Sequence, residues 1–146
     1  MNILLVEDDP NDRELLQRAL RKSGFSGRAI ALNDGIALMA YLRRAAQHQD
    51  REKYPQPDLI LLDLSLPKLP GLEVLAQLRA DPSLCQIPVV ILSGSPYARD
   101  ISDAYRLGAK TFFTKPIDTS ALDLLMSSIN QYWQLSQKPP PHQPAE

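Results

Sequence analysis

The sequence contains little cysteine, and its charges nearly cancel. Its 146 residues include one cysteine, Cys85, which excludes an internal disulfide and a cysteine-based zinc site and fits a reducing compartment. The 16 lysines and arginines against 17 aspartates and glutamates give a formal net charge of −1 at pH 7, so no bulk field favours nucleic acid or an anionic membrane. No apolar run approaches the roughly 18 residues of a membrane span. We therefore expect a cytoplasmic protein with neither nucleic acid nor membrane as its partner.

The sequence instead shows short apolar runs that alternate with helical periodicity. The predicted strands are Ile3–Val6, Ala29–Leu32, Leu59–Leu62, Val89–Leu92 and the weaker Thr111–Thr114. Apolar runs without polar alternation are typical of strands covered on both faces. Their alternation with helical stretches indicates a parallel sheet with helices packed on it, and the length suits one domain.

The first two helical stretches have a predicted inward face. The first begins with Asp9 as N-cap and Pro10 at the first helical position, and Gly24 follows its end. Its predicted inward residues are Leu15, Leu16, Ala19 and Leu20. The second follows Asn33, and its predicted inward residues are Ile36, Met39, Ala40 and Leu42. We interpret both stripes as hydrophobic core rather than as ligand sites.

Two polar segments interrupt the alternation. Gln47–Pro57 (QHQDREKYPQP) is long for a connection between a helix and a strand. Its His48 is interpreted as a solvent-exposed residue rather than a phosphodonor. Lys138–Glu146 is rich in proline and is not expected to pack. We therefore predict a folded domain over residues 1–137 and a flexible tail over residues 138–146.

Charged residues and a hydroxyl follow the carboxyl ends of the predicted strands. They are Glu7, Asp8 and Asp9 after the first strand, Asp63 after the third, Ser93 after the fourth and Lys115 after the fifth. Ligands bind beyond these ends in right-handed parallel sheets. Apart from Asp9, assigned to the helix cap, the acids would repel one another unless a hard cation such as Mg²⁺ neutralised them. With a lysine and a hydroxyl at the rim to hold phosphoryl oxygens, the pattern predicts phosphoryl transfer to a carboxylate.

These motifs resemble the receiver domains of two-component response regulators over about Asn2–Leu135. The resemblance rests on LLVEDD, on DLSLPKLPG with Asp63, Pro67 and Gly71, on SGS, and on TKP. It implies an α/β, flavodoxin-like, doubly wound fold with five parallel strands in the order 2-1-3-4-5 and five helices. It also implies that the protein is not an enzyme acting on other substrates, but a phosphoacceptor that assists its own phosphorylation and dephosphorylation.

The resemblance assigns the acids to a phosphoacceptor and a Mg²⁺ site. Asp63 would accept the phosphoryl group. Asp8 and Asp63 would be direct Mg²⁺ ligands, Glu7 would act through a metal-bound water, and the backbone carbonyl of Ser65 would complete the protein ligands. Glutamate at the position of Glu7, where the family commonly has aspartate, is compatible with a role through water.

The resemblance assigns the remaining motif residues to phosphoryl binding and to a conformational switch. Ser93 would hydrogen-bond the phosphoryl group and Lys115 would pair with it, with the Lys115–Pro116 peptide bond in the cis form. Phe112 would be the switch aromatic that rotates inward when the serine moves toward the phosphoryl group.

The implied function is that of a single-domain response regulator phosphorylated by a sensor histidine kinase. Its output would pass through a phosphorylation-dependent face made by the fourth helix, the fifth strand and the fifth helix. Because we expect no output domain, the recipient would be a downstream protein, a phosphorelay partner or a second copy in a homodimer. The long loop and the ending NQYWQL are similar to regulators that serve bacterial phytochrome kinases. In that ending, Tyr132 and Trp133 would anchor an interface, or Trp133 would fold back onto the domain.

Two other functions are alternatives to this one. An aspartyl-phosphate hydrolase of the haloacid-dehalogenase type is also α/β and Mg²⁺-dependent, but it requires a second aspartate where this sequence has Ser65. A constitutive adaptor with a receiver fold would never be phosphorylated. Acetyl phosphate with Mg²⁺ distinguishes the switch from the adaptor, because only the switch would gain a phosphoryl group on Asp63.

Overall fold

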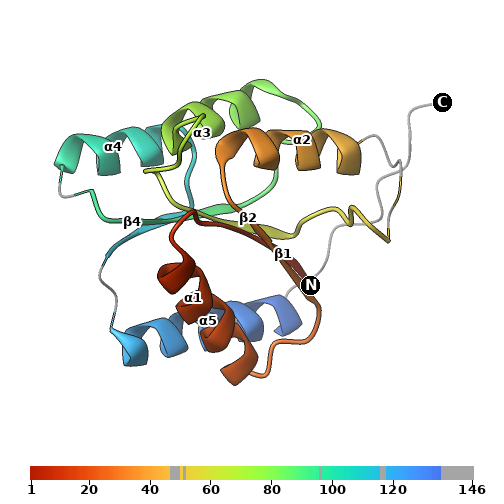
Figure 1. Ribbon diagram of the computed structural model, residues 1–146, viewed down its shortest axis with the longest axis vertical. Helices are drawn as coiled ribbons and strands as arrows, with labels where there is room; N and C mark the ends of the chain where they lie inside the picture. Colours follow the sequence, from red (N-terminus) through yellow and green to blue (C-terminus); the bar gives the residue numbers. More distant parts are fainter. Residues whose placement is uncertain (47–49, 51, 96, 116–117, 136–146) are drawn as a thin grey trace.

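Five strands and five helices alternate along the chain in a computed structural model that describes residues 1–46, 50, 52–95, 97–115 and 118–135 (Figure 1). The elements are β1 (Asn2–Val6), α1 (Pro10–Lys22), β2 (Arg28–Leu32), α2 (Gly35–Ala46), β3 (Leu59–Leu62), α3 (Gly71–Ala80), β4 (Val89–Ser93), α4 (Ala98–Arg106), β5 (Thr111–Thr114) and α5 (Thr119–Leu135). His48 and the predicted tail over residues 138–146 lie outside the described residues, as does the side chain of Trp133.

The strands form one parallel sheet in the order β2-β1-β3-β4-β5, which confirms the predicted fold class. Helices α1 and α5 lie on one face of the sheet, and α2, α3 and α4 lie on the other (Figure 1). Each face carries its own hydrophobic cluster, so alternate residues of the inner strands pack in opposite directions. Among the described residues, no helix is both long enough and apolar enough to cross a membrane.

Helix α1 begins and ends as its sequence predicts. The Asp9 carboxylate accepts hydrogen bonds from the backbone N–H groups of Asn11, at 2.8 Å, and Asp12, at 3.2 Å. Pro10 occupies the first turn of the helix, where a backbone N–H would have no partner within the helix, so its absence costs no hydrogen bond. Gly24, with φ at +77°, follows the last turn in the left-handed conformation that glycine adopts without strain. These local signals place the start of α1 directly after the carboxyl end of β1.

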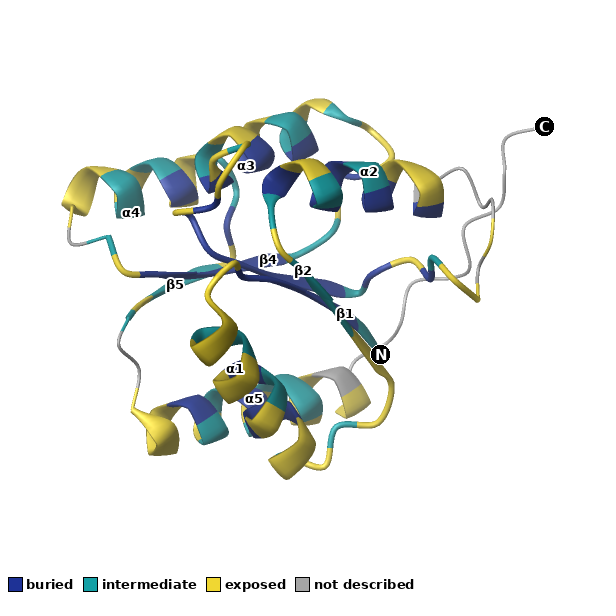
Figure 2. Ribbon diagram, viewed as in Figure 1, coloured by how far each residue is buried: buried dark blue, intermediate teal, exposed yellow. Residues whose placement is uncertain are grey.

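Three burial predictions are wrong, and Figure 2 colours the ribbon by how far each residue is buried. Leu15 is 45% exposed and Ile36 is 54% exposed. In α2 the inward residues are Leu38, Met39, Tyr41, Leu42 and Ala45. Neighbouring apolar residues of a helix can fit the three- to four-residue spacing of an inward face in more than one way. Only the packing decides which of these faces lies against the sheet. Strand β2 was expected to be covered on both faces, but its residues are exposed or half-buried because β2 is an edge strand.

The described part of the predicted 47–57 loop is held against α2. The buried hydroxyl of Tyr41 donates a hydrogen bond to the Pro55 carbonyl at 2.7 Å. The rings of Tyr41 and Tyr54 meet edge to face with centroids 5.5 Å apart, and Arg44 donates to the Tyr54 hydroxyl at 3.0 Å. This end of the loop therefore packs on the domain, although its sequence is polar.

Replacing Tyr41 with phenylalanine is expected to destabilise the fold by about 1–2 kcal/mol, because the buried Pro55 carbonyl loses its donor. Burial also raises the pKa of Tyr41 to about 12 from its ordinary value of 10.0. The fold therefore favours the neutral phenol, and this contribution is intact below pH 10 and is lost as the pH rises toward about 12. Urea unfolding at neutral pH and at about pH 11 measures both effects.

Tyr54→Phe is the matched control for Tyr41→Phe. It removes a hydroxyl that accepts from an exposed arginine, so the loss should stay within about 0.5 kcal/mol. Equal losses in the two variants would show that the Pro55 hydrogen bond is not what holds the loop.

Candidate functional site

Three carboxylates meet where β1 and β3 end side by side. Glu7 and Asp8 follow β1 and Asp63 follows β3, and one oxygen from each lies within 4.8 Å of the others. Glu7 is 1% exposed and Asp63 is 6% exposed, whereas Asp8 is exposed. Because the strands are parallel and adjacent in the sheet, the predicted acids are brought together as expected.

Lys115 reaches into this acidic group from the end of β5. Its Nζ lies 2.5 Å from Glu7 Oε2, 2.9 Å from Asp12 Oδ2 and 3.3 Å from Asp63 Oδ2. Sequence reasoning missed Asp12. The available signal was its place in the first turn of α1, a helix that starts beside the carboxyl ends of the strands. An ammonium group has three donors, so these contacts use all of them.

Burial and charge shift the pKa values of Glu7 and Lys115. Burial raises the pKa of Glu7, and the Asp63 charge adds to the rise, while hydrogen bonds from Lys115 and the Asp9 N–H oppose it. Burial by itself would lower the pKa of Lys115, but its hydrogen bonds to Glu7 and Asp12 and the charge of Asp63 outweigh burial and raise it. Lys115 is therefore a firmly charged cation at neutral pH.

The donor set of this site fits a hard divalent cation. Glu7, Asp8 and Asp63 offer carboxylate oxygens close enough to share one ion, and the exposed Asp8 leaves the group accessible to solvent. Mg²⁺ and Mn²⁺ prefer oxygen ligands of this kind. With the nearby Asp12, the group contains four acids and one lysine, so negative charge is in excess, and a divalent cation would balance it.

The segment after β3 holds Asp63 in place through the backbone. The Asp63 N–H donates to the Val6 carbonyl at 3.1 Å, and the Ser65 N–H donates to Asp63 Oδ1 at 3.0 Å. A Cβ atom on Gly71 would lie 2.6 Å from the Leu64 Cα and 2.7 Å from the Asp63 carbonyl oxygen. The close return of the chain at Gly71 therefore requires glycine, which explains its place in the DLSLPKLPG motif.

Of the other predicted site residues, Ser93 ends β4 and Phe112 lies within β5. The Lys115 N–H donates to the Ser93 carbonyl at 2.8 Å, which ties the two strand ends together. Ser93 is fully buried, and its hydroxyl accepts from the Ser95 N–H at 3.2 Å. Phe112 is half-buried against the cluster on the α2–α4 face, and its N–H donates to the Tyr105 hydroxyl at 3.1 Å. Pro116 lies outside the described residues.

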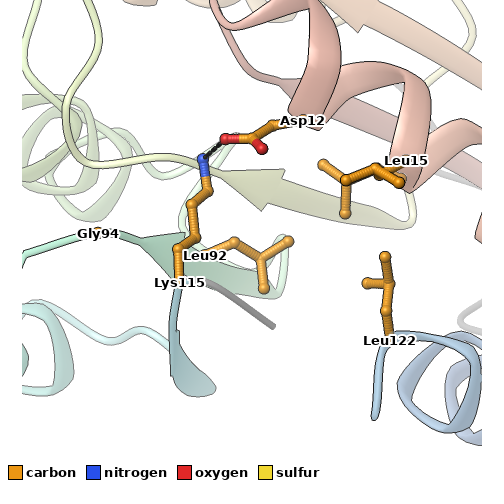
Figure 3. A pocket seen from close by; sticks show the side chains of 7 residues that line it. Asp12, Leu15, Leu92, Gly94, Lys115 and Leu122 are labelled. Atoms are coloured by element: carbon orange, nitrogen blue, oxygen red, sulfur yellow. Dashed lines mark hydrogen bonds and ion pairs between the residues drawn. The ribbon is translucent and has the colours of Figure 1, made fainter. Parts of the chain in front are cut away.

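An open cavity of about 390 Å³ lies beside Lys115. Its walls include Asp12 and Leu15 from α1, Leu92 and Gly94 from β4 and the residue after its end, and Leu122 from α5 (Figure 3). The cavity explains the exposure of Leu15, which faces this opening between α1 and α5 rather than the sheet. The ion pair of Asp12 and Lys115 therefore borders a cavity whose other walls are mainly leucine side chains.

The fold and the acidic group are those of a receiver domain, and the family comparison agrees. The model of the response regulator receiver domain matches residues 3–127. The chain therefore belongs to the response regulator receiver family, as the motifs predicted.

Relatives of this chain include phytochrome response regulators. Response regulator Rcp1 of Synechocystis is 40% identical over 131 residues, which is 90% of this chain and 87% of Rcp1. The solved structure of the phosphorylated cyanobacterial phytochrome response regulator RcpA has a TM-score of 0.79 at 39% identity, and the match covers 94% of this chain and 96% of RcpA. The Mn²⁺-bound form of Rcp1 has a TM-score of 0.78 at 38% identity, covering 95% and 98% of the two chains.

Proposed function

We propose that this protein is a single-domain response regulator that accepts a phosphoryl group on Asp63 from a sensor histidine kinase in a Mg²⁺-dependent reaction. The observation that carries the proposal is the setting of Asp63. Its carboxylate is nearly buried at the end of β3, shares a site with Glu7 and Asp8, and lies 3.3 Å from the Lys115 ammonium. Family membership supports the same chemistry.

Four residues would hold the Mg²⁺ ion. Asp8 and Asp63 would bind it directly, Glu7 would act through a water, and the Ser65 backbone carbonyl would supply the last protein oxygen. The exposure of Asp8 and Ser65 suits an ion that keeps several waters, and the Mn²⁺-bound form of Rcp1 supports a divalent cation. When bound, the ion supplies positive charge and a further contact for phosphoryl oxygens.

Asp63 would act as the nucleophile. One carboxylate oxygen attacks the phosphorus of a phosphohistidine, and the new P–O bond forms as the P–N bond breaks. The histidine ring leaves with the bonding electron pair and takes up a proton from solvent. The chain contributes position and charge: the Ser65 N–H orients Asp63, and Lys115 and the Ser93 hydroxyl stabilise the phosphoryl oxygens. By this account the protein is a phosphoacceptor that assists its own reactions, not an enzyme with a separate substrate.

Phosphorylation would be transmitted through Ser93 and Phe112 to α4, β5 and α5. The Ser93 hydroxyl would exchange its Ser95 partner for the phosphoryl group, and Phe112 would then turn inward. The Tyr105 hydroxyl links Phe112 to α4, so a shift of β5 would displace that helix. On this face Tyr105 is 47% exposed, and Tyr132 on α5 is 75% exposed, which suits a surface that binds another protein.

The partners would be other protein chains in the cytoplasm. The phytochrome response regulators among the relatives support a phytochrome kinase as the phosphodonor. The signal would pass to a downstream protein or a phosphorelay partner, or would form a homodimer through α4, β5 and α5. Neither nucleic acid nor membrane is proposed as a partner.

Incubation with acetyl phosphate and Mg²⁺ tests the proposed function. The intact protein is expected to gain the mass of one phosphoryl group, and chelating the metal with EDTA is expected to prevent the gain. Transfer from purified sensor kinases of the same cell, ranked by rate, would then identify the cognate donor. An unchanged mass with both acetyl phosphate and phosphorylated kinases would refute the switch and favour the adaptor.

A further inference from the structure

We propose that Asp12 is a positioning residue that accepts one of the three hydrogen bonds of the Lys115 ammonium before phosphorylation. In this role its carboxylate slows the reaction of an anionic phosphodonor. The inference rests on the proposed function of Asp63. It assigns to Asp12 a regulatory part in that site, namely setting how readily the site accepts a phosphoryl group from small anionic donors.

The first step of the argument is the full occupancy of Lys115. Its three donors already face Glu7 at 2.5 Å, Asp12 at 2.9 Å and Asp63 at 3.3 Å. A phosphoryl oxygen can receive a hydrogen bond from this ammonium only if one carboxylate gives up its own. The contact with Asp63, the longest of the three, joins Lys115 to the carboxylate that itself reacts. The donor that a phosphoryl oxygen takes over from another residue is therefore one that faces Asp12 or Glu7.

The second step is the cost of releasing each carboxylate. The Glu7 side chain is 2% exposed, so it cannot be rehydrated where it lies, whereas the Asp12 side chain is 39% exposed. Breaking a buried ion pair leaves an uncompensated charge, while an exposed partner returns to water at little cost. Asp12 is therefore the partner that Lys115 exchanges for the phosphoryl group.

The third step is the exposure of the Asp12 charge beside Lys115. Asp12 and Lys115 line the same open cavity, and their ion pair lies beside its apolar walls (Figure 3). A donor that comes within reach of the Lys115 ammonium also comes close to the more exposed Asp12 carboxylate, which lies 2.9 Å from it. Its negative charge is then repelled by Asp12 and attracted less strongly by Lys115. Both effects slow an anionic donor, and both vanish when the Asp12 charge is removed.

Asp12→Asn is the variant that tests this role. Phosphorylation by acetyl phosphate is expected to become about three- to fivefold faster, the size expected of a half-exposed ion pair. Phosphoramidate carries less negative charge at neutral pH, so its rate should rise by less than that of acetyl phosphate. The gain with acetyl phosphate should shrink as salt is added, because salt screens exposed charges. A merely structural role would change neither the dependence on donor charge nor the dependence on salt.

Two further variants serve as controls. Glu14→Gln removes one negative charge from the same helix, but Glu14 pairs with Arg18 and Arg21 and not with Lys115. Its rate should match that of the unaltered protein. Asp12→Glu keeps the charge and should restore the slow rate to within about a factor of two of the original.

The outcomes separate this inference from the proposed function. If the unaltered protein is phosphorylated on Asp63 but Asp12→Asn is no faster, or Glu14→Gln is accelerated equally, the role of Asp12 is refuted and the proposed function stands. Equal acceleration with both donors would also refute the role of Asp12. If the unaltered protein accepts no phosphoryl group, the proposed function fails and this inference fails with it.

Discussion

Replacing Asp63 with asparagine is expected to abolish the mass gain from acetyl phosphate and Mg²⁺ completely. The amide has nearly the same shape as the carboxylate, so the fold should persist, but its oxygen is not a competent nucleophile toward phosphorus. The variant also removes one of the three carboxylates that approach within 4.8 Å of one another. Divalent-cation affinity should therefore fall as well. Intact-protein mass spectrometry measures the first effect, and a Mg²⁺ or Mn²⁺ titration measures the second.

Asp123→Asn is the matched control for Asp63→Asn. It makes the same chemical change in α5, where Asp123 pairs with Lys22 at the end of α1 remote from the site. This variant should gain one phosphoryl group as the unaltered protein does. A phosphoryl group that survives Asp63→Asn would place the acceptor elsewhere and would contradict the proposed function.

Lys115→Met is expected to lower the free energy of unfolding by about 3–5 kcal/mol at neutral pH without a divalent cation. Methionine retains much of the apolar stem but leaves Glu7 and Asp63 buried beside each other without the ammonium between them. Burial already raises the pKa of Glu7, and removal of the hydrogen bond from Lys115 should raise it further. The fold then favours protonated Glu7, so the stability of the variant should increase as the pH falls through the raised pKa toward the ordinary value of 4.5.

Urea unfolding at several pH values, with and without Mg²⁺, checks the Lys115 prediction. Mg²⁺ should recover part of the loss, because an ion that binds only the folded state stabilises it and supplies the missing charge. Lys22→Met removes a lysine from an exposed pair with Asp123, at 2.8 Å, and should cost less than about 1 kcal/mol. A loss for Lys115→Met that depends on neither pH nor Mg²⁺ would mean that packing, not charge, is the contribution of this lysine.

Most of the fold and the acidic site were predictable from local sequence signals. Asp9 and Pro10 define the start of α1 through bonds within a few residues, and buried runs such as Leu59–Leu62 mark inner strands by their composition. The positions of Glu7, Asp8, Asp63 and Lys115 followed once the strands were recognised, because parallel strands carry their carboxyl ends to one edge. Resemblance to the receiver family supplied the strand order and the roles of the individual residues.

The burial of helix faces was less predictable. Ile36 was assigned inward but is 54% exposed, and the packed face of α2 adds Leu38 and Tyr41 to the predicted Met39 and Leu42. Leu15 faces an open cavity between α1 and α5. Both residues have the spacing expected of an apolar helix face. This periodicity does not determine how far the helix is rotated about its axis over the sheet. The polarity of the 47–57 loop likewise gave no sign that Tyr41 would bind the Pro55 carbonyl.

The sequence by itself indicated which residues form the candidate site, because the three acids and the lysine each follow a strand and are recognisable by type and place. Only the tertiary structure decided how their charges are shared. Asp12 lies 103 residues from Lys115 along the chain, and its carboxylate bonds the ammonium only because the fold brings the first turn of α1 within reach of the lysine that follows β5. Contacts over such separations depend on the relative placement of whole elements, and no local pattern encodes them. The charge that Lys115 has available for a phosphoryl group is therefore a property of the folded chain.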